Sequence, residues 1–196
     1  LVNGDGMTRL KAAGITCESG LMSTEAGNLN AGFFKRMREG LPWVRVKTAV
    51  SLDGRTALAN GTSKWITSEE SRNDVQRWRA RSSAILTGIG TVLADDPNMT
   101  ARVVELPRQP ARVIADSRWR TPADSRILSD PSAVIVFGNA SVTIPDDLVA
   151  TGVRCQPVET VDGKVALRAM LESLAGNEIN EVQVEAGAKL CGALLR

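Results

Sequence analysis

The sequence predicts an α/β domain built on a mainly parallel sheet flanked by helices. One observation is the stretch Trp43–Ser51, whose side chains alternate in character with the period of two expected of a strand with one buried face. Another is Thr67–Glu70, a capping box that predicts a helix running to about Arg81. Predicted strands and helices alternate along the rest of the chain, which is typical of parallel sheets with helical crossovers.

The remaining elements of the main domain follow from apolar runs and from glycine and proline. Apolar runs bounded by turn residues predict further strands, at Ser83–Thr87, Arg112–Asp116, Ala133–Phe137, Val153–Val158 and Glu181–Val184. A Gly-rich turn with a short helix, a central helix and a terminal helix are predicted at Gly88–Pro97, at Gly163–Leu174 and from Gly187 to the end of the chain.

The first forty residues have their own pattern. Gly6–Ala13 is expected to be the tail of a helix, and Ile15–Glu18 a short strand. A second helix, capped by Ser23 or Thr24, is expected to run to about Glu39. Its apolar residues recur at a four-residue spacing, at Leu29, Phe33 and Met37.

A domain boundary is predicted where Gly40 and Pro42 end this second helix. Residues 1–40 are then an incomplete upstream module, and the main domain occupies residues 41–196. The chain begins with Leu1 and stops at Arg196 inside an apolar helical run. We therefore expect it to be a piece of a longer protein.

Composition excludes several classes of protein. A content of 43% hydrophobic and 23% charged residues is that of a globular protein, and a net charge of +2 without a basic block argues against a nucleic-acid binder. No apolar run is long enough for a membrane span. The three cysteines, Cys17, Cys155 and Cys191, are far apart, which suits a reducing cytosol and provides no disulfide framework or zinc ligand spacing. The absence of histidine excludes histidine-based acid/base, triad and metal sites.

Lys47 is a candidate functional residue because it lies on the predicted Trp43–Ser51 strand. That strand leads through an Asp-Gly turn into a loop of small residues, Ala59–Ser63, which allow a ligand close to the backbone. A cation on a rigid strand beside such a loop is a plausible active-site layout. The alternative is an edge strand with a solvated lysine.

Two strand–glycine–helix turns, Gly88–Thr91 and Gly187–Leu190, have the features of phosphate sites, since free N–H groups and a positive dipole end suit an anion. Neither completes the dinucleotide fingerprint, because Leu93 stands where the third glycine is required. Glu185, at the carboxyl end of a strand, lies where open α/β sheets place functional groups. The alternatives are ordinary turn glycines and a carboxylate that only compensates a helix dipole.

Four ordered motifs then resemble one known family. They are Lys47–Arg55, Ser63–Thr67, Gly90–Pro97 and Val184–Gly187, and they resemble the reductase domain of the bacterial bifunctional riboflavin-biosynthesis deaminase/reductase. The resemblance covers residues 41–196 and implies a dihydrofolate-reductase-like fold that uses NADPH. Residues 1–40 resemble the end of that protein's deaminase domain and its connecting helix.

The resemblance also implies roles for individual residues. Lys47 and Glu185 match the polar pair at the reacting end, and Glu185 also matches a substrate position. Positions that hold the dinucleotide in the family match Ala49, Trp65, Thr91, Asp95, Ser117, Gly187, Ala188, Lys189, Leu190, Cys191, Gly192 and Ala193. Positions around the substrate match Ser63, Arg79, Met99 and Arg102, and the two guanidinium groups suit its phosphate.

The implied reaction is the NADPH-dependent reduction of the ribosyl group of 5-amino-6-(5-phosphoribosylamino)uracil to the ribityl form. The expected partner is this small phosphoribosyl pyrimidine, in a cytoplasmic homo-oligomer without nucleic acid or membrane. Zinc is expected only in the deaminase part of the parent protein, because the His-x-Glu and Pro-Cys-x-x-Cys motifs are absent here. The alternatives are another reductase of this fold and a non-catalytic nucleotide-binding or subunit-contact module.

Overall fold

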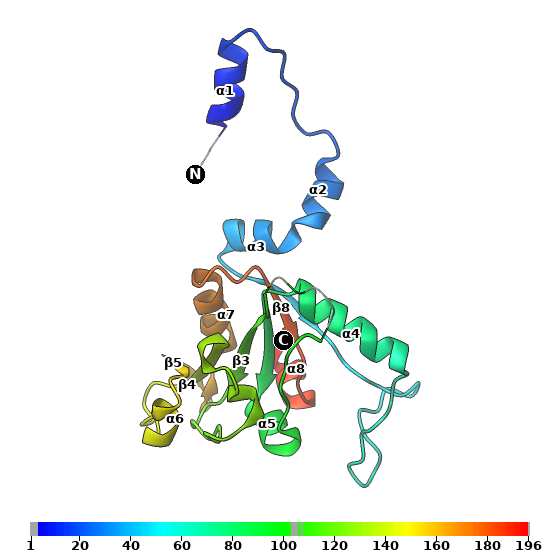
Figure 1. Cartoon of the computed structure of the whole chain (residues 1–196), viewed down its shortest axis with the longest axis vertical. Helices are drawn as coiled ribbons and strands as arrows, with labels where there is room; N and C mark the ends of the chain where they lie inside the picture. The colour runs from blue at the N-terminus through cyan, green and yellow to red at the C-terminus, as the bar shows by residue number, and fades with distance from the viewer. Residues whose placement is uncertain (1–3, 103–105, 107, 196) are drawn as a thin grey trace.

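A computed structural model of the chain describes residues 4–102, 106 and 108–195 (Figure 1). Its main sheet has six parallel strands in the order β1-β8-β2-β3-β4-β5. In that order the strands are Trp43–Val46, Glu181–Val184, Ala84–Gly88, Ala111–Ala115, Val134–Asn139 and Arg154–Val158. The predicted parallel sheet is thus confirmed, and the insertion of the last strand, β8, between β1 and β2 brings both ends of the domain to the same place.

Helices cover both faces of this sheet. The helices of the main domain are α4 Glu69–Arg81, α5 Ile89–Asp95, α6 Asp146–Ala150, α7 Leu167–Gly176 and α8 Ala188–Leu194, with 3-10 turns at Arg126–Leu128 and Pro131–Ala133. One apolar cluster joins α7 and α8 to the sheet through Met170, Leu174 and Cys191. The other, which includes Val92 and Leu148, joins α5 and α6 to it. None of the helices in the described ranges is long and apolar enough to cross a membrane.

The strand that carries Lys47 is shorter than the sequence predicts. Alternation continues to Ser51, but β1 ends at Val46, which is paired with Val184 at the end of β8. Only the N–H of Lys47 continues the ladder, donating to the carbonyl of Val184 at 3.0 Å. The following residues leave the sheet because the partner strand has ended. The predicted tight turn is present, with the N–H of Gly54 donating to the carbonyl of Ser51 and Gly54 at a φ of 80°.

Two further element boundaries differ from the prediction. The N-cap of α4 is Ser68, one residue later than predicted, and its hydroxyl accepts from the N–H of Ser71. The central helix α7 begins at Leu167 because a small antiparallel hairpin, β6 Thr160–Val161 and β7 Lys164–Val165, precedes it. Asp162 and Gly163 both have positive φ there, and Asp-Gly is a strong signal for a two-residue hairpin turn that the prediction overlooked.

Residues 4–40 form three helices, α1 Asp5–Ala12, α2 Ser23–Leu29 and α3 Ala31–Glu39, and α1 lies away from the sheet (Figure 1). The single helix predicted after Ser23 is wrong, because Asn30 interrupts it with a φ of −114° and its side chain bonds the carbonyl of Ala26. The strand expected at Ile15–Glu18 is also wrong, since that segment forms no regular element. The stripe Leu29, Phe33 and Met37 is exposed.

Candidate active site

One cavity of about 650 Å³ lies beside the carboxyl ends of β1 and β8. Its wall is formed by the loop after β1, by Arg79 of α4, by the end of α5 with the segment that follows, and by the turn after β8. The sequence-predicted residues on this wall are Lys47, Ala49, Ser63, Trp65, Arg79, Thr91, Asp95, Met99, Arg102, Glu185, Gly187, Ala188 and Cys191. Segments far apart in sequence therefore meet around one space.

The other predicted site residues do not line this cavity. They are Ser117, Lys189, Leu190, Gly192 and Ala193. Ser117 lies beyond β3, and its hydroxyl accepts from the N–H of Val165 at 2.9 Å, so it holds the small hairpin. Leu190 packs on β2, where its Cδ2 would lie 3.4 Å from a Cβ placed on Gly88. The absence of a side chain at Gly88 therefore allows α8 to pack closely against β2.

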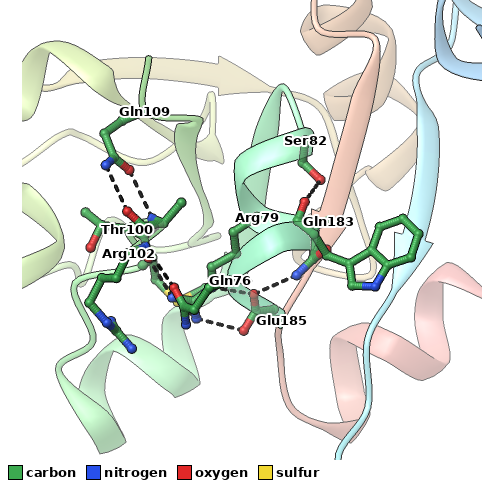
Figure 2. Close-up of polar contacts among 11 residues, drawn as sticks. Gln76, Arg79, Ser82, Thr100, Arg102, Gln109, Gln183 and Glu185 are labelled. Carbon is green, nitrogen blue, oxygen red and sulfur yellow. Dashed lines mark hydrogen bonds and ion pairs between the residues drawn. The ribbon is translucent and has the colours of Figure 1, made fainter. Parts of the chain in front are cut away.

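Glu185 is held by a bidentate ion pair with Arg79 (Figure 2). Arg79 Nε lies 2.6 Å from Oε1 of Glu185, and Nη2 lies 2.8 Å from Oε2. The third nitrogen, Nη1, donates to the carbonyl of Thr100 at 2.8 Å. Both side chains are nearly buried, with 11% and 10% exposed, so this is a fixed pair in a low-dielectric setting.

The surroundings of Glu185 favour the ionised carboxylate. Burial alone raises the pKa of Glu185, but the hydrogen bonds and charge of Arg79, the amide of Gln183 and the charge of Lys47 together bring the pKa below its ordinary value. Glu185 is therefore an acceptor at neutral pH. The arrangement also shows Arg79 engaged with a protein carboxylate, whereas the sequence assigned it to the substrate phosphate.

Lys47 is the available cation on the same wall. It follows β1 directly and is half-buried, and its charge helps to lower the pKa of Glu185. Within the part of the chain that the structure describes, its ammonium has neither a hydrogen bond nor an ion pair. A half-buried ammonium beside a carboxylate that is already occupied by an arginine is well placed to meet a ligand.

The turn after β8 has room for an anionic group. Gly187 lies on the cavity wall, and a Cβ added to it would have no atom within 4 Å. No side chain in the described part of the chain caps α8, so N–H groups of its first turn are available to donate to a ligand. These features fit the phosphate part of a dinucleotide. Among the described residues, no group of three or more Cys, Asp or Glu could hold a metal ion.

Comparisons with known proteins agree with the motifs in the sequence. The family model for the RibD C-terminal domain matches residues 42–196. The chain belongs to this family. The earlier resemblance is thereby confirmed, together with the dihydrofolate-reductase-like, mainly parallel fold.

Individual relatives of this RibD-type chain cover it almost completely. It is 42% identical to riboflavin biosynthesis protein RibD of Escherichia coli over 100% of its own length and 56% of that protein. Acinetobacter baumannii RibD has a TM-score of 0.87 and 43% identity, over 98% of this chain and 53% of that one. The chain therefore spans about half the length of such relatives.

A third relative carries a descriptive name. It is a diaminohydroxyphosphoribosylaminopyrimidine deaminase/5-amino-6-(5-phosphoribosylamino)uracil reductase from Thermotoga maritima. Its structure matches with a TM-score of 0.80 and 32% identity, over 96% of this chain and 51% of that one.

Some residues in the cavity wall of this RibD-type chain, or directly behind it, were not predicted. Lys64 lies between the predicted Ser63 and Trp65, so its place in the loop was a usable signal. Arg126 reaches the wall from a 3-10 turn, and no sequence pattern indicated it. Gln183, on the buried middle of β8, donates to Glu185 at 2.9 Å. It was overlooked because it lies inside an ordinary strand pattern.

Proposed function

We propose that this chain is the reductase part of a riboflavin-biosynthesis enzyme. It reduces the ribosyl group of 5-amino-6-(5-phosphoribosylamino)uracil to the ribityl form with NADPH. The observation that carries the proposal is the juxtaposition, in one cavity, of three groups: the ammonium of Lys47, which has no partner among the described residues, the fixed carboxylate of Glu185 and the open Gly187 turn. The reductase named for the Thermotoga relative supports the substrate class.

Lys47 and Glu185 have different roles in the proposed reaction because they carry opposite charges. Lys47 supplies the proton that accompanies reduction of the sugar carbon and stabilises negative charge as it develops. Glu185, ionised and fixed by Arg79, accepts hydrogen bonds from the substrate. The dinucleotide, when bound, supplies the hydride. The Gly187 turn and the wall residues Thr91 and Asp95 hold it in place.

The substrate phosphate needs a cation that is not already engaged. Arg79 has a partner at every guanidinium nitrogen, so we assign it to fixing Glu185. Arg102 lines the same cavity, and only its backbone N–H has a bond among the described contacts, to Gln76. We therefore propose Arg102 as the phosphate ligand, with Ser63 and Met99 lining the substrate end.

The same proposal extends to the parent protein. We propose that residues 1–40 are the end of a deaminase domain whose zinc site lies outside this chain, and that the parent also deaminates the preceding pyrimidine. The deaminase/reductase name of the Thermotoga relative supports this reading. We expect a homo-oligomer in the cytoplasm. The free state of Cys17, Cys155 and Cys191 supports a reducing compartment.

Steady-state kinetics of the full-length protein test the function. NADPH consumption with the phosphoribosylamino-uracil is expected for the wild type, and Lys47→Ala should lower kcat on the order of 10²- to 10⁴-fold, as for a lost acid/base group. KM should change little, because the interaction is made mainly in the transition state. A pocket lysine makes few core contacts, so Tm should be unchanged.

Lys35→Ala is the matched control, because Lys35 is ion-paired with Glu39 on α3 and lies away from the cavity. It should leave kcat unaltered. A wild-type protein that does not consume NADPH with this substrate would contradict the proposed activity. Normal turnover of Lys47→Ala with a lower Tm would show that Lys47 is a structural residue.

A further inference from the structure

Gln183 is a buried polar residue on the face of β8 that also carries Glu185, and its register partner on β1 is Arg45. Gln183 is fully buried between Val182 and Val184, which belong to the core on the opposite face of β8. Its Nε2 donates to Oε1 of Glu185 at 2.9 Å (Figure 2). Its Oε1 is buried and has no hydrogen-bond partner in the described part of the structure. A buried amide with one unpaired end costs stability compared with an apolar side chain.

The contacts of Glu185 show what this amide achieves. Among the described residues, Oε1 of Glu185 receives two donors, Arg79 Nε and Gln183 Nε2, while Oε2 receives only Arg79 Nη2. An ionised carboxylate has about four acceptor positions, so Oε2 is the oxygen that keeps room for a ligand. The amide cannot be reversed, because its oxygen would then face the carboxylate.

We propose that Gln183 is a positioning residue of the reductase site, whose amide fixes the Glu185 carboxylate so that Oε2 is presented to the substrate. This inference rests on the proposed function. Gln183 touches neither the cavity nor the reacting atoms and acts only through Glu185. The buried amide of Gln183 lowers the stability of the fold, but it orients the Glu185 carboxylate before the substrate binds.

The charge on Glu185 offers a direct readout of this role. Arg79 from α4 and Lys47 from the end of β1 are the charged groups that act on it. The amide of Gln183 also lowers the pKa of Glu185, after Arg79 and ahead of Lys47, so its loss should raise that pKa. Other charged residues of the cavity wall are Lys64, Asp95, Asp96, Arg102 and Arg126.

The test compares Gln183→Met with Thr87→Val in the full-length protein. Thr87 is fully buried on the neighbouring strand β2, and its hydroxyl also has no partner among the described residues. Both changes remove a buried polar group in favour of an apolar one of similar shape, but only Gln183 contacts Glu185. Kinetics against pH, thermal unfolding and a ¹³C NMR titration of the Glu185 carboxyl, assigned with Glu185→Gln, are measured for each protein.

Gln183→Met should lower kcat/KM on the order of tenfold, as for loss of one hydrogen bond to a charged group. The acid limb of the curve of kcat/KM against pH and the NMR titration of the Glu185 carboxyl should both move to higher pH. Tm should stay the same or rise. Thr87→Val should change neither the kinetics nor the titration. A purely structural Gln183 would lower Tm without moving the titration, and that result would overturn the proposal.

An unchanged titration in Gln183→Met, or an equal shift in Thr87→Val, would overturn it as well. The NMR titration does not require turnover. If the protein proves inactive on the uracil substrate, the proposed function fails, while the titration still decides whether Gln183 controls Glu185.

Discussion

The inner wall of the cavity, formed by Arg79 and Glu185, contrasts with the outer wall, formed by Lys47, Ser63–Trp65 and Gly187. On the inner wall every guanidinium nitrogen of Arg79 has a partner and Glu185 is 10% exposed. On the outer wall Trp65 is 73% exposed and, in the described structure, the ammonium of Lys47 has no partner. Charge is thus fixed on one side and left available on the other.

This difference matches two separate needs of the proposed reductase, which would bind a cofactor and a substrate. A fixed carboxylate can stabilise charge without rearranging during the reaction. A loop that carries exposed side chains can adapt as ligands enter and leave. Trp65 illustrates this loop: its side chain is largely exposed, and its ring packs against the guanidinium of Arg72, 4.4 Å from the ring centre. We therefore expect changes on the inner wall to affect stability and changes on the outer wall to affect binding.

The largest effect should come from breaking the inner ion pair. Arg79→Met leaves the Glu185 carboxylate buried without its main partner, and the free energy of unfolding should fall by about 3–5 kcal/mol at neutral pH. Urea denaturation measures this. Arg77→Met is the control, because Arg77 is on the exposed side of the same helix, and it should stay within about 0.5 kcal/mol. Adding Glu185→Leu to Arg79→Met should restore much of the loss.

The loss of unfolding free energy in Arg79→Met should also depend on pH, and the pKa of Glu185 sets the direction of this dependence. The folded pKa of Glu185 lies below its ordinary value of 4.5. Its contribution to stability is therefore complete above that value and is lost as the pH falls through the lower, folded pKa. Without Arg79, burial raises the pKa of Glu185 instead. The difference between wild type and variant should shrink as the pH falls from 7 toward 4, and a constant difference would mean that packing, not charge, is lost.

Much of the fold could be predicted from the sequence because buried parallel strands are short apolar runs. The strands predicted at Ser83–Thr87 and Arg112–Asp116 are each displaced by one residue from the observed β2 and β3. The end of β1 could not be predicted, because alternation continues past Val46 while its partner β8 stops at Val184. A strand ends where its neighbour ends, and that information lies elsewhere in the chain.

The site was only partly predictable for a similar reason. Local motifs identified Lys47, Gly187 and Glu185, which lie near strand ends, where open sheets place functional groups. The pairing of Arg79 with Glu185 joins residues 106 apart in sequence, so no local pattern contains it. Gln183 alternates with valines and is typical of a solvated strand face. That face is buried because α4 covers it with the side chain of Arg79.

On the outer wall, Gly187→Val should weaken NADPH binding by about tenfold or more, because a branched side chain obstructs the approach of phosphate to the backbone. The fold should tolerate the change, since Gly187 has a φ of −71° and no atom lies within 4 Å of an added Cβ. Calorimetry of NADPH binding measures the effect. Gly176→Val is the control, at an equally open glycine of α7 that does not line the cavity and has no assigned role. Equal affinities in all three proteins would remove the Gly187 turn from the cofactor site.

The smallest effect is expected at the rim, where Lys64 and Asp95 join the loop after β1 to the end of α5. Their atoms Nζ and Oδ1 are 4.0 Å apart, and the side chains are 66% and 50% exposed. An exposed pair at this distance is worth about 0–1 kcal/mol and is screened by salt. Lys64→Ala should therefore change the free energy of unfolding by less than about 0.5 kcal/mol and kcat/KM by about twofold at most, with the difference vanishing at high salt. A salt-resistant loss of tenfold or more in kcat/KM would show that this pair closes the outer wall over bound ligands, and the two walls would then both be fixed during turnover.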